Sequence, residues 1–143
     1  MPFEYRGDIA HADVAFNAWA GTLEELFREA ARATMQVMVE NLAAVRPTQT
    51  VDLKLEQENL EMLLFDFLNE LIFYKDARRL ILLPDHLAIS ESDGGYMVEG
   101  TLRGEEIDVA RHEMNTDVKA VTMLRYSLEQ VPQGWRATVV LDV

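Results

Sequence analysis

Apolar and polar residues alternate along the chain with two different periods, and each period predicts one kind of element. Residues 9–19 alternate with the period of a strand. Thr22 and Glu25 then have the spacing of a capping box, in which side chains satisfy the free backbone donors at a helix start. Apolar residues continue at helical spacing from Leu23 to Met38. We therefore expect a strand followed by a helix that ends at about residue 40.

The same two periods recur after Pro47. Apolar residues at Val51, Leu53 and Leu55 alternate with polar ones, which predicts a second strand. Asn59 is a typical N-cap residue, and a wide apolar stripe at helical spacing runs from there to Ile72. We therefore expect a second helix that lies against a sheet.

The rest of the chain is typical of strands. Residues 80–103 predict two strands separated by the turn 92–95, with Pro84 at a bend or a sheet edge. Residues 118–130 and 135–143 predict a last pair, joined by a turn at 131–134. These elements predict an α+β fold, in which two helices pack on one face of a mainly antiparallel β-sheet. With no linker or repeat, residues 1–143 are expected to form a single compact domain.

The composition indicates in which cellular compartment this domain is expected. The chain begins with acidic residues rather than a basic and apolar leader, and no apolar run approaches the ~20 residues needed to cross a bilayer. Cysteine is absent, so disulfides and thiolate zinc sites are excluded. We expect a cytoplasmic protein without membrane contact.

The charge balance argues against direct nucleic-acid binding. The chain holds 25 acidic and 13 basic residues, for a net charge of −12 at pH 7. Its lysines are only Lys54, Lys75 and Lys119, and the arginines are scattered. Binding to nucleic acid normally needs clustered cations that neutralise phosphates. A metal ion or a basic protein surface is a better match, although many of the acids simply face water.

No sequence motif indicates an enzyme. The chain has no glycine-rich phosphate loop, no nucleophile elbow and no histidine pair at metal-ligand spacing. A Ser-His-Asp triad is recognised only in space, and nothing in the sequence indicates one. No catalytic residue is therefore predicted.

Two acidic residues lie within apolar strand patterns. Asp13 interrupts the first predicted strand, and Asp142 follows Val139, Val140 and Leu141 in the last. Both could face water on the outer side of the sheet. Alternatively, they share a divalent cation such as calcium or magnesium, which prefers oxygen ligands, with the terminal carboxylate of Val143 as a further donor.

Several segments match a known family in the right order. They are Tyr5 to Glu29, with His11-Ala12-Asp13 and Gly21-Thr22-Leu23-Glu24-Glu25-Leu26-Phe27; Leu63 to Leu71; Gly104-Glu105-Glu106-Ile107-Asp108, His112 and Val118-Lys119-Ala120-Val121-Thr122; and Gly134-Trp135 through Leu141-Asp142-Val143. Together they resemble the archease family over nearly the whole chain. The chain departs from the family pattern at Ala12, where threonine is usual, and at Met123-Leu124, where Tyr-His is usual.

The resemblance implies a non-catalytic activator of the GTP- and manganese-dependent RNA ligase that acts in tRNA splicing and RNA repair. Such proteins promote guanylation and multiple turnover of the ligase, and they bind a divalent cation described as calcium. The family's metal ligands correspond to Asp13, Asp142 and the carboxylate of Val143. The family has a lysine in a Lys-Ala-x-Thr segment, and this lysine corresponds to Lys119. The resemblance implies that Lys119 contacts the ligase or its nucleotide.

A regular hairpin limits what Lys119 can touch. With Gln133 near the tip, Asp142 is expected opposite Met123 or Leu124. Lys119 then lies about four residues further along, or ~13 Å at ~3.3 Å per residue. On this register we expect Lys119 not to reach the ion at Asp142.

Two other functions remain open. An acidic surface equally suits a general adaptor or chaperone of another RNA-modifying enzyme, such as a tRNA methyltransferase. A metal-dependent hydrolase that uses Asp13 and Asp142 is the third possibility, although such enzymes normally have more ligands and a base near an open metal position.

Overall fold

The computed structural model describes residues 2–7 and 13–143. Along the chain the elements are β1 Phe3–Tyr5, β2 Val14–Ala20, α1 Leu23–Met38, the short 3₁₀ helix Leu42–Ala44, β3 Gln49–Gln57, α2 Leu60–Arg78, β4 Leu80–Ser92, β5 Gly95–Glu106, β6 Ala120–Val131 and β7 Gly134–Asp142. The part of the first predicted strand that precedes Asp13 lies outside the described residues.

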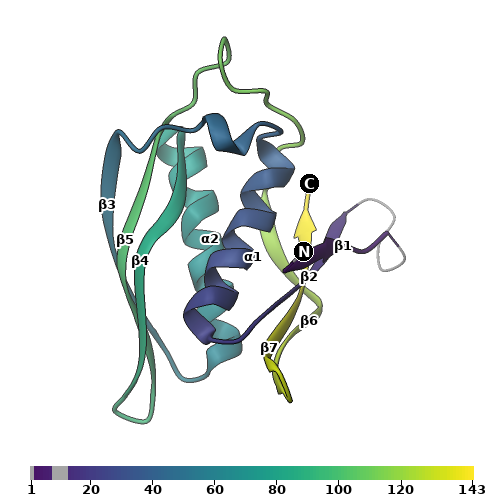
Figure 1. The fold of residues 1–143 in the computed structure, drawn as a ribbon, viewed down its shortest axis with the longest axis vertical. Helices are drawn as coiled ribbons and strands as arrows, with labels where there is room; N and C mark the ends of the chain where they lie inside the picture. The colour runs from purple at the N-terminus through teal and green to yellow at the C-terminus, as the bar shows by residue number, and fades with distance from the viewer. Residues whose placement is uncertain (1, 8–12) are drawn as a thin grey trace.

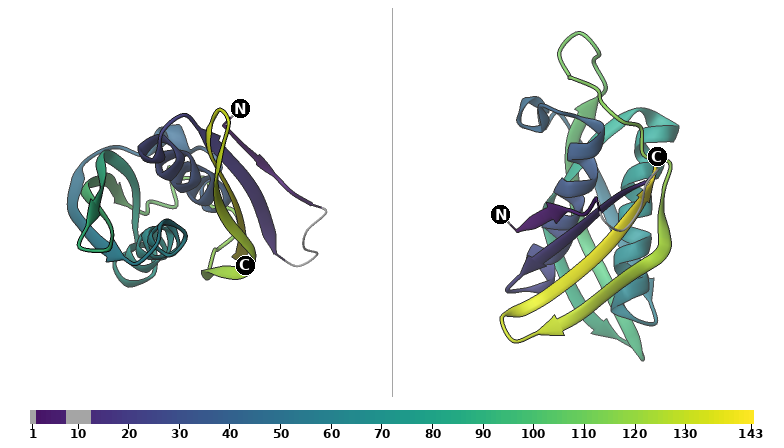
Figure 2. Two further views of the ribbon diagram at one scale, coloured as in Figure 1. Left: turned by 90° about the horizontal axis from the view of Figure 1, so that it is seen from below. Right: turned by 90° about the vertical axis from the view of Figure 1, so that its right-hand side faces the viewer.

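The strands form two antiparallel sheets with the helices between them. One sheet has the order β1-β2-β7-β6 and the other the order β3-β5-β4. Figure 1 shows α1 and α2 as a middle layer, with β3, β5 and β4 on one side and β2, β7 and β6 on the other. The views in Figure 2 show the same three layers from two further directions. The predicted α+β fold, with two helices and antiparallel strands, is thus confirmed, but the single sheet expected from the sequence is two sheets.

The physical reason for two sheets lies in the helices. The buried residues of α2 are Leu63, Leu64, Phe67, Leu68, Leu71, Ile72 and Lys75. At 3.6 residues per turn they form a stripe over about half of the helix circumference, which is wide enough to meet a sheet on each side. α2 contacts β3 and β4 on one side and β6 on the other, and α1 contacts β4, β2 and β7 in the same way.

Both helix starts are capped as the sequence predicts. The Thr22 hydroxyl accepts a hydrogen bond from the Glu25 N–H, and the Asn59 side chain accepts one from the Met62 N–H. Such caps satisfy backbone donors that have no partner within the helix. Neither helix in the described ranges is long and apolar enough to cross a membrane.

Pro84 marks both a bend and an edge. Strand β4 lies at one edge of its sheet, and its register with β5 shifts between Pro84 and His86. A proline cannot donate to a strand ladder, which is why it occurs at edges and bulges.

A long segment without regular structure, residues 107–119, joins β5 to β6. Its anchor is the buried carboxylate of Glu105, which accepts hydrogen bonds from the Arg46 N–H at 2.8 Å, from Arg111 Nη2 at 2.5 Å and from His112 Nε2 at 2.8 Å. The Asp108 N–H donates to Nδ1 of His112, so this ring carries its proton on Nε2. This network holds the first half of the segment against the end of β5.

The Glu105 network predicts a pH dependence of stability. The hydrogen bond from Arg111 lowers the pKa of Glu105 to about 2, against the opposing effect of burial. A carboxyl with a lowered folded-state pKa stabilises the fold above its unfolded pKa, and this contribution is lost as the pH falls towards 2. Urea unfolding between pH 7 and pH 2 should therefore show a smaller decline for Glu105→Gln than for the wild type.

At pH 7 the Glu105→Gln variant should be less stable by about 2 kcal/mol, because it loses charge-assisted hydrogen bonds. Glu106→Gln is the matched control, since Glu106 is the exposed neighbour on the same strand. Parallel pH profiles for all three proteins would contradict this role of Glu105.

Candidate functional site

The pairing of β2 with β7 brings the two predicted acidic ligands to one place. These strands are antiparallel, and Val14 pairs with Leu141. Asp13 immediately precedes Val14, and Asp142 immediately follows Leu141. The two residues therefore lie at the same end of this strand pair although they are far apart in sequence.

Both aspartates are half-buried. Within the described part of the chain, neither carboxylate takes part in a hydrogen bond or an ion pair. Ionised carboxylates that are partly removed from water normally need a cation or several donors. Such oxygens are suited to a hard divalent cation, which takes oxygen ligands from carboxylates, carbonyls and water.

In the described ranges no three acidic or histidine residues are placed so that they could hold a metal ion together. A cation at Asp13 and Asp142 would therefore need main-chain and water oxygens in addition to the two carboxylates. Val143, the residue that follows β7, offers main-chain oxygen at this same end of the sheet. The metal assignment of Asp13, Asp142 and Val143 stays a prediction.

Lys119 lies beside Asp142, so the register expected from the sequence is wrong. Ala120, not Met123 or Leu124, pairs with Asp142. The Lys119 N–H donates a hydrogen bond of 2.8 Å to the main-chain oxygen of Asp142. The structure therefore brings Lys119 to the end of the sheet where Asp13 and Asp142 lie. We call these three residues and Val143 the chain-end corner.

A large bulge in β6 causes this change of register. Ser127 pairs with Thr138, whereas Thr122 pairs with Val140, so the four residues 123–126 lie opposite the single residue Val139. Within the bulge Met123 is 58% exposed and Leu124 is 50% exposed. Arg125 has a φ of 48°, in the left-handed region that a residue with a Cβ seldom adopts.

Helix α2 holds the segment next to the corner through two polar side chains. The buried ammonium of Lys75 donates to Asp117 Oδ1 at 2.5 Å and to the main-chain oxygen of Val118 at 2.9 Å. The Asn69 Oδ1 accepts a hydrogen bond from the Val121 N–H at 3.0 Å.

The sequence alone predicts no role for Lys75 or Asn69. One signal was available for the lysine, which follows Leu68 and Leu71 at helical spacing and so falls within the apolar stripe of α2. A charge in such a stripe needs a buried partner. Asn69 carries no comparable signal, because an amide is common on any helix surface.

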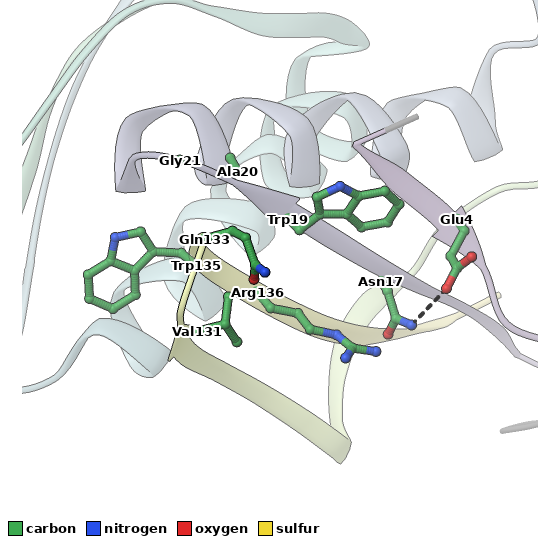
Figure 3. A pocket seen from close by; sticks show the side chains of 9 residues that line it. All are labelled: Glu4, Asn17, Trp19, Ala20, Gly21, Val131, Gln133, Trp135 and Arg136. Atoms are coloured by element: carbon green, nitrogen blue, oxygen red, sulfur yellow. Dashed lines mark hydrogen bonds between the residues drawn. The ribbon is translucent and has the colours of Figure 1, made fainter.

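A groove of about 560 Å³ lies at the other end of the β2–β7 pair. Figure 3 shows Trp19, Trp135 and Arg136 around it, with Asn17 hydrogen-bonded to Glu4. Trp19 pairs with Arg136 across the two strands. None of the residues predicted to be functional lines this groove.

The chain is similar to known proteins over its whole length. Residues 3–143 match the model of the "Archease protein family (MTH1598/TM1083)". Curated relatives named "Protein archease" include one from Pyrococcus furiosus, 35% identical over 92% of this chain and 93% of its own, and one from Methanopyrus kandleri, 35% identical over 100% of both chains.

Two solved structures have the same fold. The solution structure of Methanobacterium thermoautotrophicum protein 1598 is 33% identical, covers 99% of both chains and has a TM-score of 0.84. A crystal structure from Thermotoga maritima, described as "an archease, possible chaperone", is 21% identical, covers 96% of both chains and has a TM-score of 0.62. At this identity the second likeness shows the fold alone.

The backbone strain at Arg125 predicts the effect of glycine there. Arg125→Gly should raise the free energy of unfolding by about 0.5–1 kcal/mol, because glycine adopts a positive φ without a steric penalty. Arg136→Gly, the same change in the regular strand β7, should lower it by a similar amount. Urea denaturation measures both, and an equal loss in the two variants would contradict strain at the bulge.

Proposed function

The chain belongs to the archease family, and on that premise we propose that it is a non-catalytic activator of a GTP- and manganese-dependent RNA ligase. In this proposal it promotes guanylation of the ligase and allows multiple turnover in tRNA splicing or RNA repair. The observation that carries the proposal is the family match over residues 3–143 in a chain that retains Asp13, Lys119 and Asp142.

The proposed ligands of a divalent cation, calcium in this proposal, are Asp13, Asp142 and Val143. Support comes from the two half-buried carboxylates without a donor or cation among the described residues, and from their position at one end of the β2–β7 pair. A bound cation would offset the repulsion between the carboxylates and tie the start of β2 to the end of β7.

The proposed role of Lys119 is contact with the ligase or its bound nucleotide. Its side chain is exposed, while its main chain is fixed by the hydrogen bond to Asp142. An ammonium group carries only donors, so it cannot coordinate a cation, but it can bind a phosphate or a carboxylate of a partner.

Activation in this proposal needs no chemistry in this chain. A net charge of −12 favours encounter with a basic protein surface. If the chain binds the guanylation-competent form of the ligase more tightly than the other forms, it raises the population of that form. The proposed partner is therefore the ligase protein rather than the RNA.

Calcium should stabilise the wild type, because a ligand that binds only the folded state raises its stability. At a calcium concentration 100 times the dissociation constant the gain is about 2.7 kcal/mol. Asp13→Asn and Asp142→Asn should each lose most of this gain in thermal melts with calcium or with chelator. Asp52→Asn, an exposed site on β3 in the other sheet, should keep it. An equal gain in all four proteins would remove the proposed site.

Substoichiometric amounts of the protein should convert the RNA ligase of its own organism from single to multiple turnover. Guanylation of the ligase and ligation of RNA halves measure this effect. Asp13→Asn, Asp142→Asn and Lys119→Ala should each reduce stimulation by at least about tenfold, as is usual for groups at an essential contact. Lys119→Ala should nevertheless keep the calcium-dependent stabilisation, because its ammonium is not a ligand.

If the wild type leaves the ligase rate unchanged, the proposal fails. Copurification with a different RNA-modifying enzyme would then favour the adaptor function. Hydrolysis of phosphoesters by the isolated protein, lost in Asp13→Asn, would instead favour the hydrolase.

A further inference from the structure

The start of β6 is weakly held by its own sheet. Among the described strands β6 lies at the edge of its sheet, with β7 as its one neighbour. On the corner side of the bulge only Ala120, Val121 and Thr122 pair with β7 before the register shifts. A short edge segment with few ladder hydrogen bonds opens easily unless another element holds it.

Lys75 holds this segment from the helix layer. Its side chain is 6% exposed, and its three N–H donors have three acceptors, Asp117 Oδ1, Asp76 Oδ1 at 2.6 Å and the main-chain oxygen of Val118. Burial lowers the pKa of Lys75, but the hydrogen bonds to Asp117 and Asp76 outweigh it, so the net shift is upward. The ammonium is therefore charged and fully hydrogen-bonded at neutral pH.

Asn69 holds the same segment from the other side of Lys119. Its side chain accepts from the Val121 N–H, a group on the edge of β6 that has no strand beside it. Lys75 thus binds the chain just before Lys119, and Asn69 binds it just after Ala120. We call Lys75 and Asn69 the α2 clamp.

We propose that Lys75, together with Asn69, is a positioning residue that fixes Lys119 and the main chain opposite Asp142 in the geometry needed for ion binding and ligase activation. This inference rests on the proposed function of the chain-end corner. It adds a support from α2 to residues that lie at the ends of β2, β6 and β7.

The atoms that the α2 clamp contacts support a positioning role. A slip of the strand by one residue would turn every side chain to the opposite face of the sheet, so the register of this short segment has to be held. The hydrogen bonds of Lys75 and Asn69 go to particular main-chain atoms, the oxygen of Val118 and the nitrogen of Val121. Only one register satisfies both.

Amide hydrogen exchange without metal tests the clamp. In Lys75→Met, which keeps a buried side chain of similar length, the amides of Lys119 and Val121 should exchange at least about tenfold faster, since the local opening becomes easier. Neither amide is bonded to Lys75 itself. Amides of β5, the central strand of the other sheet, should change little.

Lys54→Met is the matched control, because it removes the same charge from an exposed site on β3. Asp117→Asn provides a second variant that leaves the core untouched, since the Asp117 side chain is 67% exposed. If Lys119 and Val121 exchange no faster than the β5 amides in both variants, Lys75 is a general stabiliser and the inference is overturned.

The functional arm measures calcium affinity and ligase stimulation. In Lys75→Met the calcium dissociation constant should rise by about 10- to 100-fold, as is usual when a group behind a metal ligand is removed. Stimulation of the ligase should fall together with the calcium affinity, while Lys54→Met behaves as the wild type.

Faster exchange with unchanged calcium affinity and unchanged stimulation would overturn the functional role of the clamp. A wild type that neither binds calcium nor stimulates the ligase defeats the proposed function, and the exchange data then still decide whether Lys75 positions Lys119.

Discussion

The pairing of β2 with β7 joins the first long strand of the chain to its last, and the whole chain-end corner depends on it. Val14 and Leu141 are separated by most of the chain, so loop-closure entropy opposes this contact. Apolar burial offsets that cost, because Phe16, Val139 and Leu141 are fully buried against the helix layer. The half-buried aspartates therefore sit at the end of a ladder that the core fixes, which gives them defined positions without side-chain partners among the described residues.

The bulge in β6 decides which residues complete this corner. A regular hairpin would place Met123 opposite Asp142, and Lys119 would lie beyond the end of β7. The residues 123–126 lie opposite Val139 alone, so β6 is longer than the stretch of β7 that it accompanies and Ala120 meets Asp142. The cost is visible in the positive φ of Arg125 and in the exposure of Met123 and Leu124. Strain and exposed apolar surface next to the corner are thus consequences of bringing Lys119 to it.

The periodic features of the fold could be read from the sequence, whereas the features that depend on pairing between distant segments could not. Thr22 and Asn59 predicted the starts of the two helices, because an N-cap hydrogen bond joins residues that are close in sequence. The wide apolar stripe of α2 indicated burial, but it did not reveal that a sheet lies on each side. For the corner, the aspartates stood out as polar residues in apolar strands. The bulge did not, because Met123-Leu124-Arg125 contains no glycine, proline or asparagine to signal a break in the strand.

Polar contacts add to apolar ones at the start of β6, and the reason lies in the position of this segment. Val118 and Val121 are buried in the core, and their burial already opposes a slip that would turn them to the other face. The hydrogen bonds from Lys75 and Asn69 add contacts to single main-chain atoms, which apolar packing does not provide. A buried ammonium with three acceptors costs desolvation energy, which only a fully satisfied arrangement offsets. Any slip of the strand would leave Lys75 with an unmet donor and Val118 with an unmet carbonyl. The penalty for that error is larger than the gain from the correct contact, and this asymmetry makes a buried lysine a stricter determinant of register than a leucine in the same place.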